Sequence, residues 1–143
     1  MVGAIIAKRA IRSAFGALNR GDIDTFMRAW SENCIFVYPG RVHAGGQFIG
    51  KPQARLWFER FIKQFPQRKF TVNHVAVDGI LDMVGNNTIF AQLDLQLTNK
   101  NGLKCTNSGV SMIKLEGSKV TRVEDFLRII DGDDYQRGWG DIP

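Results

Sequence analysis

Histidine and cysteine are scarce in this chain of 143 residues, which has two of each. The sequence contains no CxxC or HxH spacing, so a metal site is not expected. It also lacks the GxSxG turn that presents a catalytic serine. Cys34 and Cys105 stand alone; such thiols are usually small buried side chains in a reducing compartment, and nothing in their spacing supports a disulfide. We expect no metal and no other cofactor.

A long hydrophobic run is also missing. The opening segment MVGAIIAKRAIRS places its charges after a very short apolar stretch, which is the wrong order and length for a secretory signal. No later segment approaches the length needed to cross a membrane. With 44% hydrophobic residues and no low-complexity tract, residues 1–143 are expected to form one soluble, cytoplasmic domain with its own core.

The net charge of +5 is unevenly distributed along the chain, with basic residues concentrated in the first half and acidic residues late. A basic middle segment can attract an anionic ligand or a nucleic acid. Most of its cations, however, fall on the polar faces of predicted helices, and no binding module with stacking aromatics accompanies them. We therefore expect no nucleic-acid partner.

Three helices are predicted from apolar residues recurring every three to four positions. The first covers residues 5–18 and stops at Asn19-Arg20-Gly21. Asp22 is a suitable N-cap for a second, short helix whose apolar positions continue to Trp30. Pro52 lies in the first turn of the third, which ends before Pro66.

The remaining segments read as strands separated by turn residues. They are expected at 34–38, 69–77, 80–84, 88–98, 103–115 and 119–129, with a glycine-rich loop over 39–50 and a polar tail over 130–143. Consecutive strands joined by tight turns imply a mainly antiparallel sheet, and grouped helices imply an α+β fold.

A curled sheet wrapped on aromatic helix faces would leave a hydrophobic pocket at its open end. For any one aromatic residue, ordinary core packing remains an alternative to ligand contact. The candidates to line the pocket are Trp57, Phe61, Trp30, Phe36 and Phe15.

Asp125 is the strongest candidate for chemistry. In KVTRVEDFLRII it shares its alternate positions with Val123, Leu127 and Ile129, so a strand here would point a carboxylate the same way as apolar side chains. A carboxyl group in a partly dry pocket often has a raised pKa, which suits proton transfer near neutral pH. The alternatives are an acid paired with a nearby arginine, or a shifted register that places Glu124 inside.

Four strings, in their order and spacing, resemble the nuclear transport factor 2-like superfamily, in particular its SnoaL-like and limonene-epoxide-hydrolase-like branches. They are ALNRGDIDTFMRAW, CIFVYPG, FIGKPQARLWFERFIKQFP and LKCTNSGVSMIKLEGSKVTRVEDF. The resemblance implies a cone in which three helices pack into a curved mixed sheet around a deep hydrophobic pocket. Members include isomerases, cyclases, hydrolases, dehydratases and noncatalytic domains, so fold alone does not decide function.

The resemblance also implies roles for particular residues. An Asp on the last strand transfers protons in the related cyclases and epoxide hydrolases, and Asp125 falls at that position. The epoxide hydrolases use an Arg and a second Asp on an earlier strand; here Gln92 replaces the Arg and Asp94 matches the Asp. The alternation of the strand itself, however, places Asp94 with Gln92 on the polar face. A position on a solvated face or in a subunit interface is therefore as well supported as a catalytic role.

The ketosteroid isomerases give a negative comparison. Tyr38 stands at the position of their base, Ala14 at that of their tyrosine and Ser111 at that of their second acid, so their specific mechanism is not expected. Tyr38 can still donate a hydrogen bond to a ligand oxygen.

Neither histidine is a strong candidate for ligand contact: His43 is expected to be exposed to solvent, and the orientation of His74 is undecided. His74 lies in FTVNHVAVDG, where both alternations are partly apolar, so it is either an ordinary strand residue or a ligand contact. His43 lies in the glycine-rich loop. The segment Gly45 to Lys51 has the spacing of a phosphate loop, but Pro52 replaces the residue that would bind magnesium.

Taken together, the sequence predicts a cone that binds a small, largely apolar molecule. If it is an enzyme, we expect cofactor-independent acid/base chemistry (isomerisation, cyclisation, dehydration or water addition), with Asp125 and Tyr38 as catalytic residues and Asp94 as a second carboxylate. The alternative is a noncatalytic binding or dimerisation domain. In either case a homodimer through the sheet is expected.

Overall fold

The structure is a computed structural model that describes residues 2–79 and 85–140. The expected strand at 80–84 lies outside these residues. Six strands form one sheet in the order β2-β1-β6-β5-β4-β3. Their bounds are Trp30–Tyr38 (β1), Gly46–Ile49 (β2), Gln67–Val77 (β3), Asn87–Thr98 (β4), Lys104–Glu116 (β5) and Lys119–Leu127 (β6).

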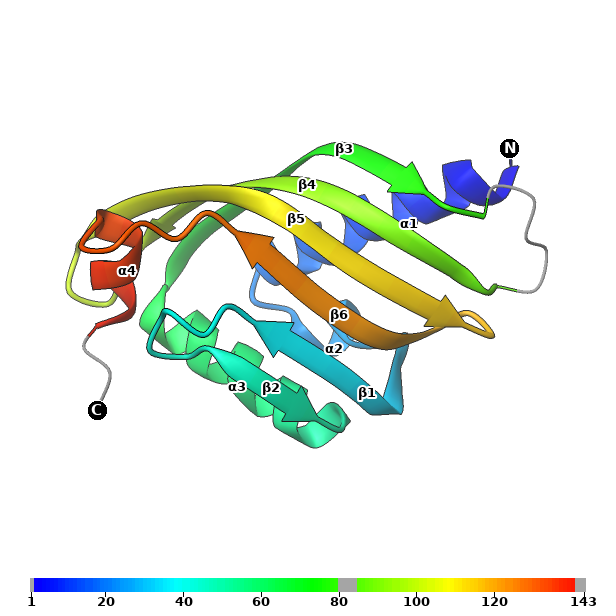
Figure 1. The fold of residues 1–143 in the computed structure, drawn as a ribbon, viewed down its shortest axis with the longest axis horizontal. Coiled ribbons are helices and arrows are strands. Elements are labelled where there is room, and N and C mark those ends of the chain that lie inside the picture. The colour runs from blue at the N-terminus through cyan, green and yellow to red at the C-terminus, as the bar shows by residue number, and fades with distance from the viewer. Residues whose placement is uncertain (1, 80–84, 141–143) are drawn as a thin grey trace.

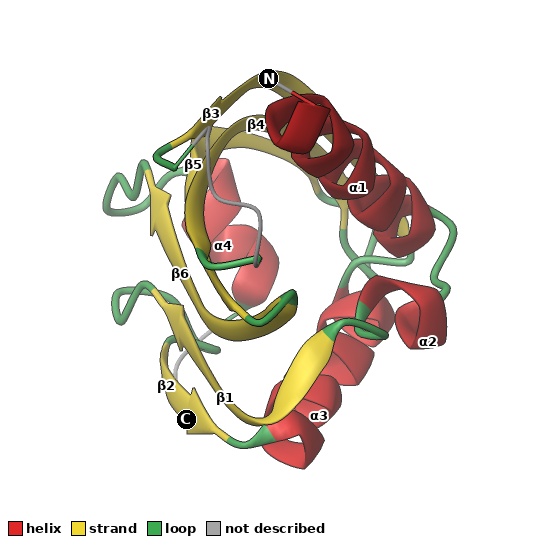
Figure 2. Ribbon diagram, turned by 90° about the vertical axis from the view of Figure 1, so that its right-hand side faces the viewer, coloured by secondary structure: helices red, strands yellow, loops and turns green. Residues whose placement is uncertain are grey.

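The sheet is mixed and strongly curled. β1 and β6 run parallel, and every other neighbouring pair is antiparallel. Helices α1 (Val2–Asn19), α2 (Ile23–Phe26) and α3 (Lys51–Gln64) lie on the concave side of the sheet (Figures 1 and 2). The predicted α+β cone is therefore confirmed. None of the helices in the described residues is long and apolar enough to span a membrane.

The apolar stripes of the helices form the core, as their periodicity predicts. Ala17 and Leu18 of α1 and Ala54 and Phe61 of α3 are almost completely buried. Pro52 lies in the first turn of α3, where a missing N–H costs nothing. Burial of these stripes against the sheet supplies most of the stability of the helices.

The second helix is shorter than predicted. Asp22 caps it by accepting a hydrogen bond from the Thr25 N–H at 3.1 Å, but the helix ends at Phe26. Trp30 begins β1 instead of ending a helix. Phe26, Met27 and Trp30 are all buried. Their spacing suggested a longer helix, but it arises because a turn and the start of β1 bury these residues on the same side.

The predicted loop over 39–50 contains the edge strand β2. It pairs with β1 through Ile35–Ile49, Phe36–Phe48 and two further positions. The prediction of a loop was wrong because a short, glycine-rich edge strand has little side-chain pattern; its hydrogen bonds to β1 determine it.

The C-terminal tail is also ordered where it is described. β6 ends at Leu127, two residues earlier than predicted, and α4 covers Asp134–Trp139. Asp133 caps α4 by accepting a hydrogen bond from the Gln136 N–H at 2.8 Å. Tyr135 and Trp139 are 1% and 5% exposed, so the aromatic residues of the tail pack into the interior of their own chain.

Two glycine substitutions test how tightly α4 is docked. A Cβ at Gly138 would lie 2.9 Å from the Cys105 Sγ and 3.2 Å from the Phe65 ring, whereas one at Gly16 of α1 meets only the Arg20 side chain at 3.5 Å. We expect Gly138→Ala to lower the free energy of unfolding by about 1–3 kcal/mol through overpacking. Gly16→Ala, the matched control, should raise it by about 0.5–1 kcal/mol. Urea denaturation measures both; equal stabilisation by the two variants would contradict tight docking.

Candidate functional site

Asp125 points into the interior of the cone. It lines a small cavity together with its β6 neighbours Val123 and Leu127, as their shared alternation suggests. The cavity volume is about 30 Å³, which leaves room for about two water molecules. The other lining residues are mostly aromatic and aliphatic: Phe15, Leu18, Phe26, Phe36, Tyr38, Trp57, Phe58, Phe61, Phe70, Leu93, Leu95 and Ser111.

The carboxyl group of Asp125 has one hydrogen-bond donor among residues 2–79 and 85–140. The Ser111 hydroxyl, on the neighbouring strand β5, donates to its Oδ1 at 2.7 Å. Burial raises the pKa of Asp125 to about 6, although the Ser111 hydrogen bond acts in the opposite direction. No arginine pairs with Asp125 among the described residues. The carboxyl group can therefore exchange a proton near neutral pH.

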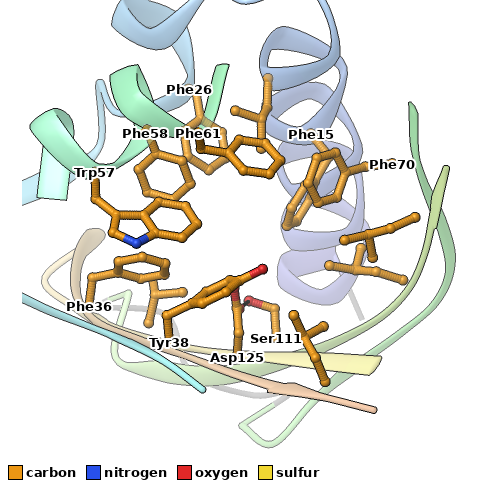
Figure 3. Close-up of a pocket in the computed structure, with 15 residues that line it drawn as sticks. Phe15, Phe26, Phe36, Tyr38, Trp57, Phe58, Phe61, Phe70, Ser111 and Asp125 are labelled. Carbon is orange, nitrogen blue, oxygen red and sulfur yellow. Dashed lines mark hydrogen bonds between the residues drawn. The ribbon is translucent and has the colours of Figure 1, made fainter. Parts of the chain in front are cut away.

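Tyr38 lies at the end of β1 and is 4% exposed. Its hydroxyl is hydrogen-bonded to the hydroxyl of Tyr135 on α4. Burial raises the pKa of both phenols well above the usual value, so both carry their protons at neutral pH. Within such a pair only one O–H group donates, and the other proton remains available. Figure 3 shows Tyr38, Ser111 and Asp125 on the sheet side of the cavity, opposite the aromatic side chains of α1 and α3.

A larger cavity adjoins the first between α1 and the sheet. Its volume is about 420 Å³, and its wall is almost entirely apolar. Four residues line both cavities: Phe15, Phe26, Ser111 and Val123. Ser111, which donates a hydrogen bond to Asp125, therefore lies at the boundary between the larger cavity and the Asp125 cavity.

The predicted aromatic contacts divide between the two cavities. Trp57, Phe61 and Phe36 line the Asp125 cavity, Trp30 lines the larger one, and Phe15 lines both. All five also pack ring to ring in one cluster. Trp30 is joined through Phe36 and Trp57 to Phe61, and Phe15 joins Trp30 through Phe26. The same side chains thus form the core and the cavity wall.

Three predicted site residues are not in the cavity. Asp94 is exposed and accepts hydrogen bonds from Asn73 Nδ2 at 2.7 Å and from Gln92 Nε2 at 3.2 Å. Gln92 and His74 pair with each other across β4 and β3, on the convex face of the sheet. The alternation of β4 buries Leu93 and Leu95. Asp94 therefore lies on the polar face of its strand, which was the alternative to a place beside Asp125.

A β-bulge explains why the orientation of His74 was undecidable. The register of β3 against β4 shifts between Val72 and His74. The extra residue, Asn73, makes the inward alternation change from Phe70 and Val72 to Val75 and Val77. Both alternations in the sequence are therefore partly apolar.

Sequence reasoning missed two contributors. Tyr135 was placed in a polar tail whose conformation the sequence left undecided, although Asp133 followed three residues later by Gln136 is a helix-start signal. Ser111 was considered only in the comparison with the ketosteroid isomerases. Its position two residues before the buried Ile113 of β5 places it on the same, inward face of the strand. Within residues 2–79 and 85–140, no group of His, Cys, Asp and Glu side chains is arranged to hold a metal ion.

Residues 11–123 match the family model of the SnoaL-like domain. No curated protein matches the sequence. Among solved structures, Bal32a from a soil-derived mobile gene cassette is similar at 16% identity and a TM-score of 0.77, covering 95% of this chain and 98% of that one. TerC, co-crystallised with polyporic acid, is similar at 16% identity and 0.70 (84% and 89% covered). An LEH-like epoxide hydrolase from M. tuberculosis is similar at 15% and 0.66 (92% and 86%).

Substitution of Asp125 by Asn tests the buried carboxyl group. Because the pKa of Asp125 is about 6 when folded and 3.8 in its ordinary state, the unfolded chain loses the proton first as pH rises. The cost of burial is therefore absent below about pH 3.8 and complete above about pH 6. We expect Asp125→Asn to raise the free energy of unfolding at pH 8 by up to roughly 3 kcal/mol, and by much less at pH 4.

Urea denaturation at the two pH values measures this difference. Asp94→Asn is the matched control, since the same change on an exposed side chain should alter stability little at either pH. A variant at position 125 that is less stable than wild type at both pH values would contradict the account.

Proposed function

The chain belongs to the SnoaL-like domain family, and we propose that it binds a small, largely apolar molecule and catalyses proton transfer through Asp125. Members of this family bind small ligands and often act as isomerases or hydrolases. The observation that carries the proposal is the position of the Asp125 carboxyl group, whose pKa is about 6, in an aromatic cavity with Ser111 as its hydrogen-bond donor.

The cavity between α1 and the sheet would hold the body of the ligand. Its volume of about 420 Å³ falls within the usual range of small-molecule sites, roughly 300–1,000 Å³. Its wall is formed by side chains such as Ile11, Ala14 and Ile113, which favour an uncharged ligand. The reacting carbon would lie beyond Ser111, toward Asp125.

The residues of the site then have distinct roles. At pH 7 a carboxyl group of pKa about 6 is roughly 90% ionised and can take a proton from a carbon acid. The Ser111 hydroxyl stabilises the carboxylate by donating to it. When Tyr135 donates to Tyr38, the O–H group of Tyr38, on the wall of the cavity, would donate to an oxygen atom of the ligand. Asp125 would then return the proton. Isomerisation and many cyclisations and dehydrations contain such a step, and in water addition the base would take the proton from water instead.

Hydrogen exchange in D₂O tests proton transfer without knowledge of the natural substrate. Enolisable cyclic ketones such as 2-tetralone and 2-cyclohexenone carry an acidic C–H next to an oxygen atom. We expect the wild-type protein to accelerate deuterium uptake, which NMR follows directly. Asp125→Asn should slow the protein-dependent exchange by at least about 100-fold, since a positioned base contributes roughly 10²–10⁴.

The indole N–H signal of Trp30, which lines the larger cavity, reports binding independently of turnover. It should shift equally in the wild type and in Asp125→Asn. Ketones that shift this signal but exchange at the buffer rate with the wild-type protein would contradict catalysis and favour the alternative, a noncatalytic ligand-binding domain.

We further propose that the convex face of the sheet forms a homodimer interface. Phe90 and Phe126 are 40% and 54% exposed there. They lie beside Met112 and Val110, their respective partners across β4, β5 and β6. An exposed apolar patch of this kind favours burial against a second copy.

Light scattering coupled to size exclusion measures the oligomeric state. The wild type should be a dimer at micromolar concentration, and Phe126→Glu should be a monomer, because two copies of a charge would face each other across a two-fold axis. Ile49→Glu, on the exposed edge strand β2, should leave the dimer intact. A monomeric wild type would overturn this interface.

A further inference from the structure

We propose that a groove between α3, α4 and the loop before β2 is a second binding site, which takes a planar aromatic anion such as an aryl carboxylate. The groove has a volume of about 410 Å³. It lies outside the Asp125 cavity and shares only Trp57 with it. The proposal does not depend on Asp125 or on proton transfer.

Aromatic side chains form the base of the groove. Trp57 of α3 and Trp139 of α4 lie against each other, with ring centroids 5.6 Å apart, and Phe48 of β2 completes the base. Both indoles are otherwise buried. Only the indole edges reach the groove, and Phe48, which is partly buried, leaves more of its ring open. An aromatic base of this kind favours a ligand with an apolar ring.

The rim is cationic. Arg60 and Lys63 of α3 and Lys100 of the β4–β5 turn line the groove, together with His43. No carboxylate lines it. In the part of the chain that the structure describes, no salt bridge involves Arg60, Lys63 or Lys100. The positive charge at the rim is therefore uncompensated and favours an anion.

Hydrogen bonds hold the walls of the groove in place. The Trp57 indole N–H donates to the Ala44 carbonyl at 2.8 Å, which fixes the loop before β2 against α3. Gln64 Nε2 donates to the Gly138 carbonyl at 2.7 Å, and the Lys100 N–H donates to the Gln64 carbonyl at 2.8 Å. These bonds join α3, α4 and the β4–β5 turn without a ligand, so the groove is formed in advance and little ordering opposes binding.

An aromatic base and a cationic rim recognise different parts of one small molecule. The ring of an aryl carboxylate would lie against the partly buried Phe48 and the open edges of the two indoles. Its charge would meet Arg60 and Lys63, which offer charge-assisted hydrogen bonds. A nucleic acid would instead need a longer basic stripe along its backbone. The groove is thus suited to a single small anion.

Titration with 2-naphthoate, followed by the indole signals in ¹H–¹⁵N spectra, tests the proposal. The chain has three tryptophans, and they report different places. We expect the signals of Trp57 and Trp139 to shift, while that of Trp30, in the cavity beside α1, stays unchanged. The neutral 2-naphthamide should bind at least several-fold more weakly, and added salt should weaken naphthoate binding.

Charge substitutions locate the site. Arg60→Gln with Lys63→Gln should raise the Kd for 2-naphthoate roughly tenfold by removing both hydrogen-bonding cations. Lys8→Gln with Arg12→Gln, which removes the same charge from an exposed face of α1, should leave the Kd unchanged, as should Asp125→Asn. Equal weakening by the two double variants, or equal binding of the acid and the amide, would overturn the proposal. If the wild-type protein shows no exchange activity but binds naphthoate as expected, only the catalytic proposal is overturned.

Discussion

The partial burial of one carboxyl group among aromatic rings is the constraint on which the site depends. Asp125 accepts a hydrogen bond from Ser111 at 2.7 Å, and burial raises its pKa to about 6. Removing a carboxylate from water is costly unless it is paired. This cost is the reason that we propose proton transfer as the role of Asp125.

The fold supplies what surrounds that group. The curled sheet brings β1, β5 and β6 together, so that Tyr38, Ser111 and Asp125 converge from three strands (Figure 3). Helix α4 then adds Tyr135, which pairs with Tyr38. The C-terminal segment therefore belongs to the site as well as to the core. α4 also contributes Trp139 to the groove between α3, α4 and the loop before β2. Trp57 lines both this groove and the Asp125 cavity, so it separates the two proposed sites.

Side-chain alternation was enough to predict the inward position of Asp125 and most of the strands, because each strand has one buried face. It was not enough where register or pairing decides the structure. The bulge at Asn73 reversed the alternation around His74, and the edge strand β2 depends on its partner β1. The resemblance to other enzymes suggested a role for Asp94 that its exposed position does not support. The meeting of Tyr38 with Tyr135, 97 residues apart, is a tertiary contact that no local pattern contains.

The titration of the Asp125 carboxyl group tests this account most directly. Its carboxyl ¹³C signal, assigned by its loss in Asp125→Asn, can be followed by NMR from pH 3 to pH 9. The account predicts a pKa of about 6. A pKa at or below the ordinary value of 3.8 would show that the group is well solvated or paired, and would contradict the proposed proton transfer.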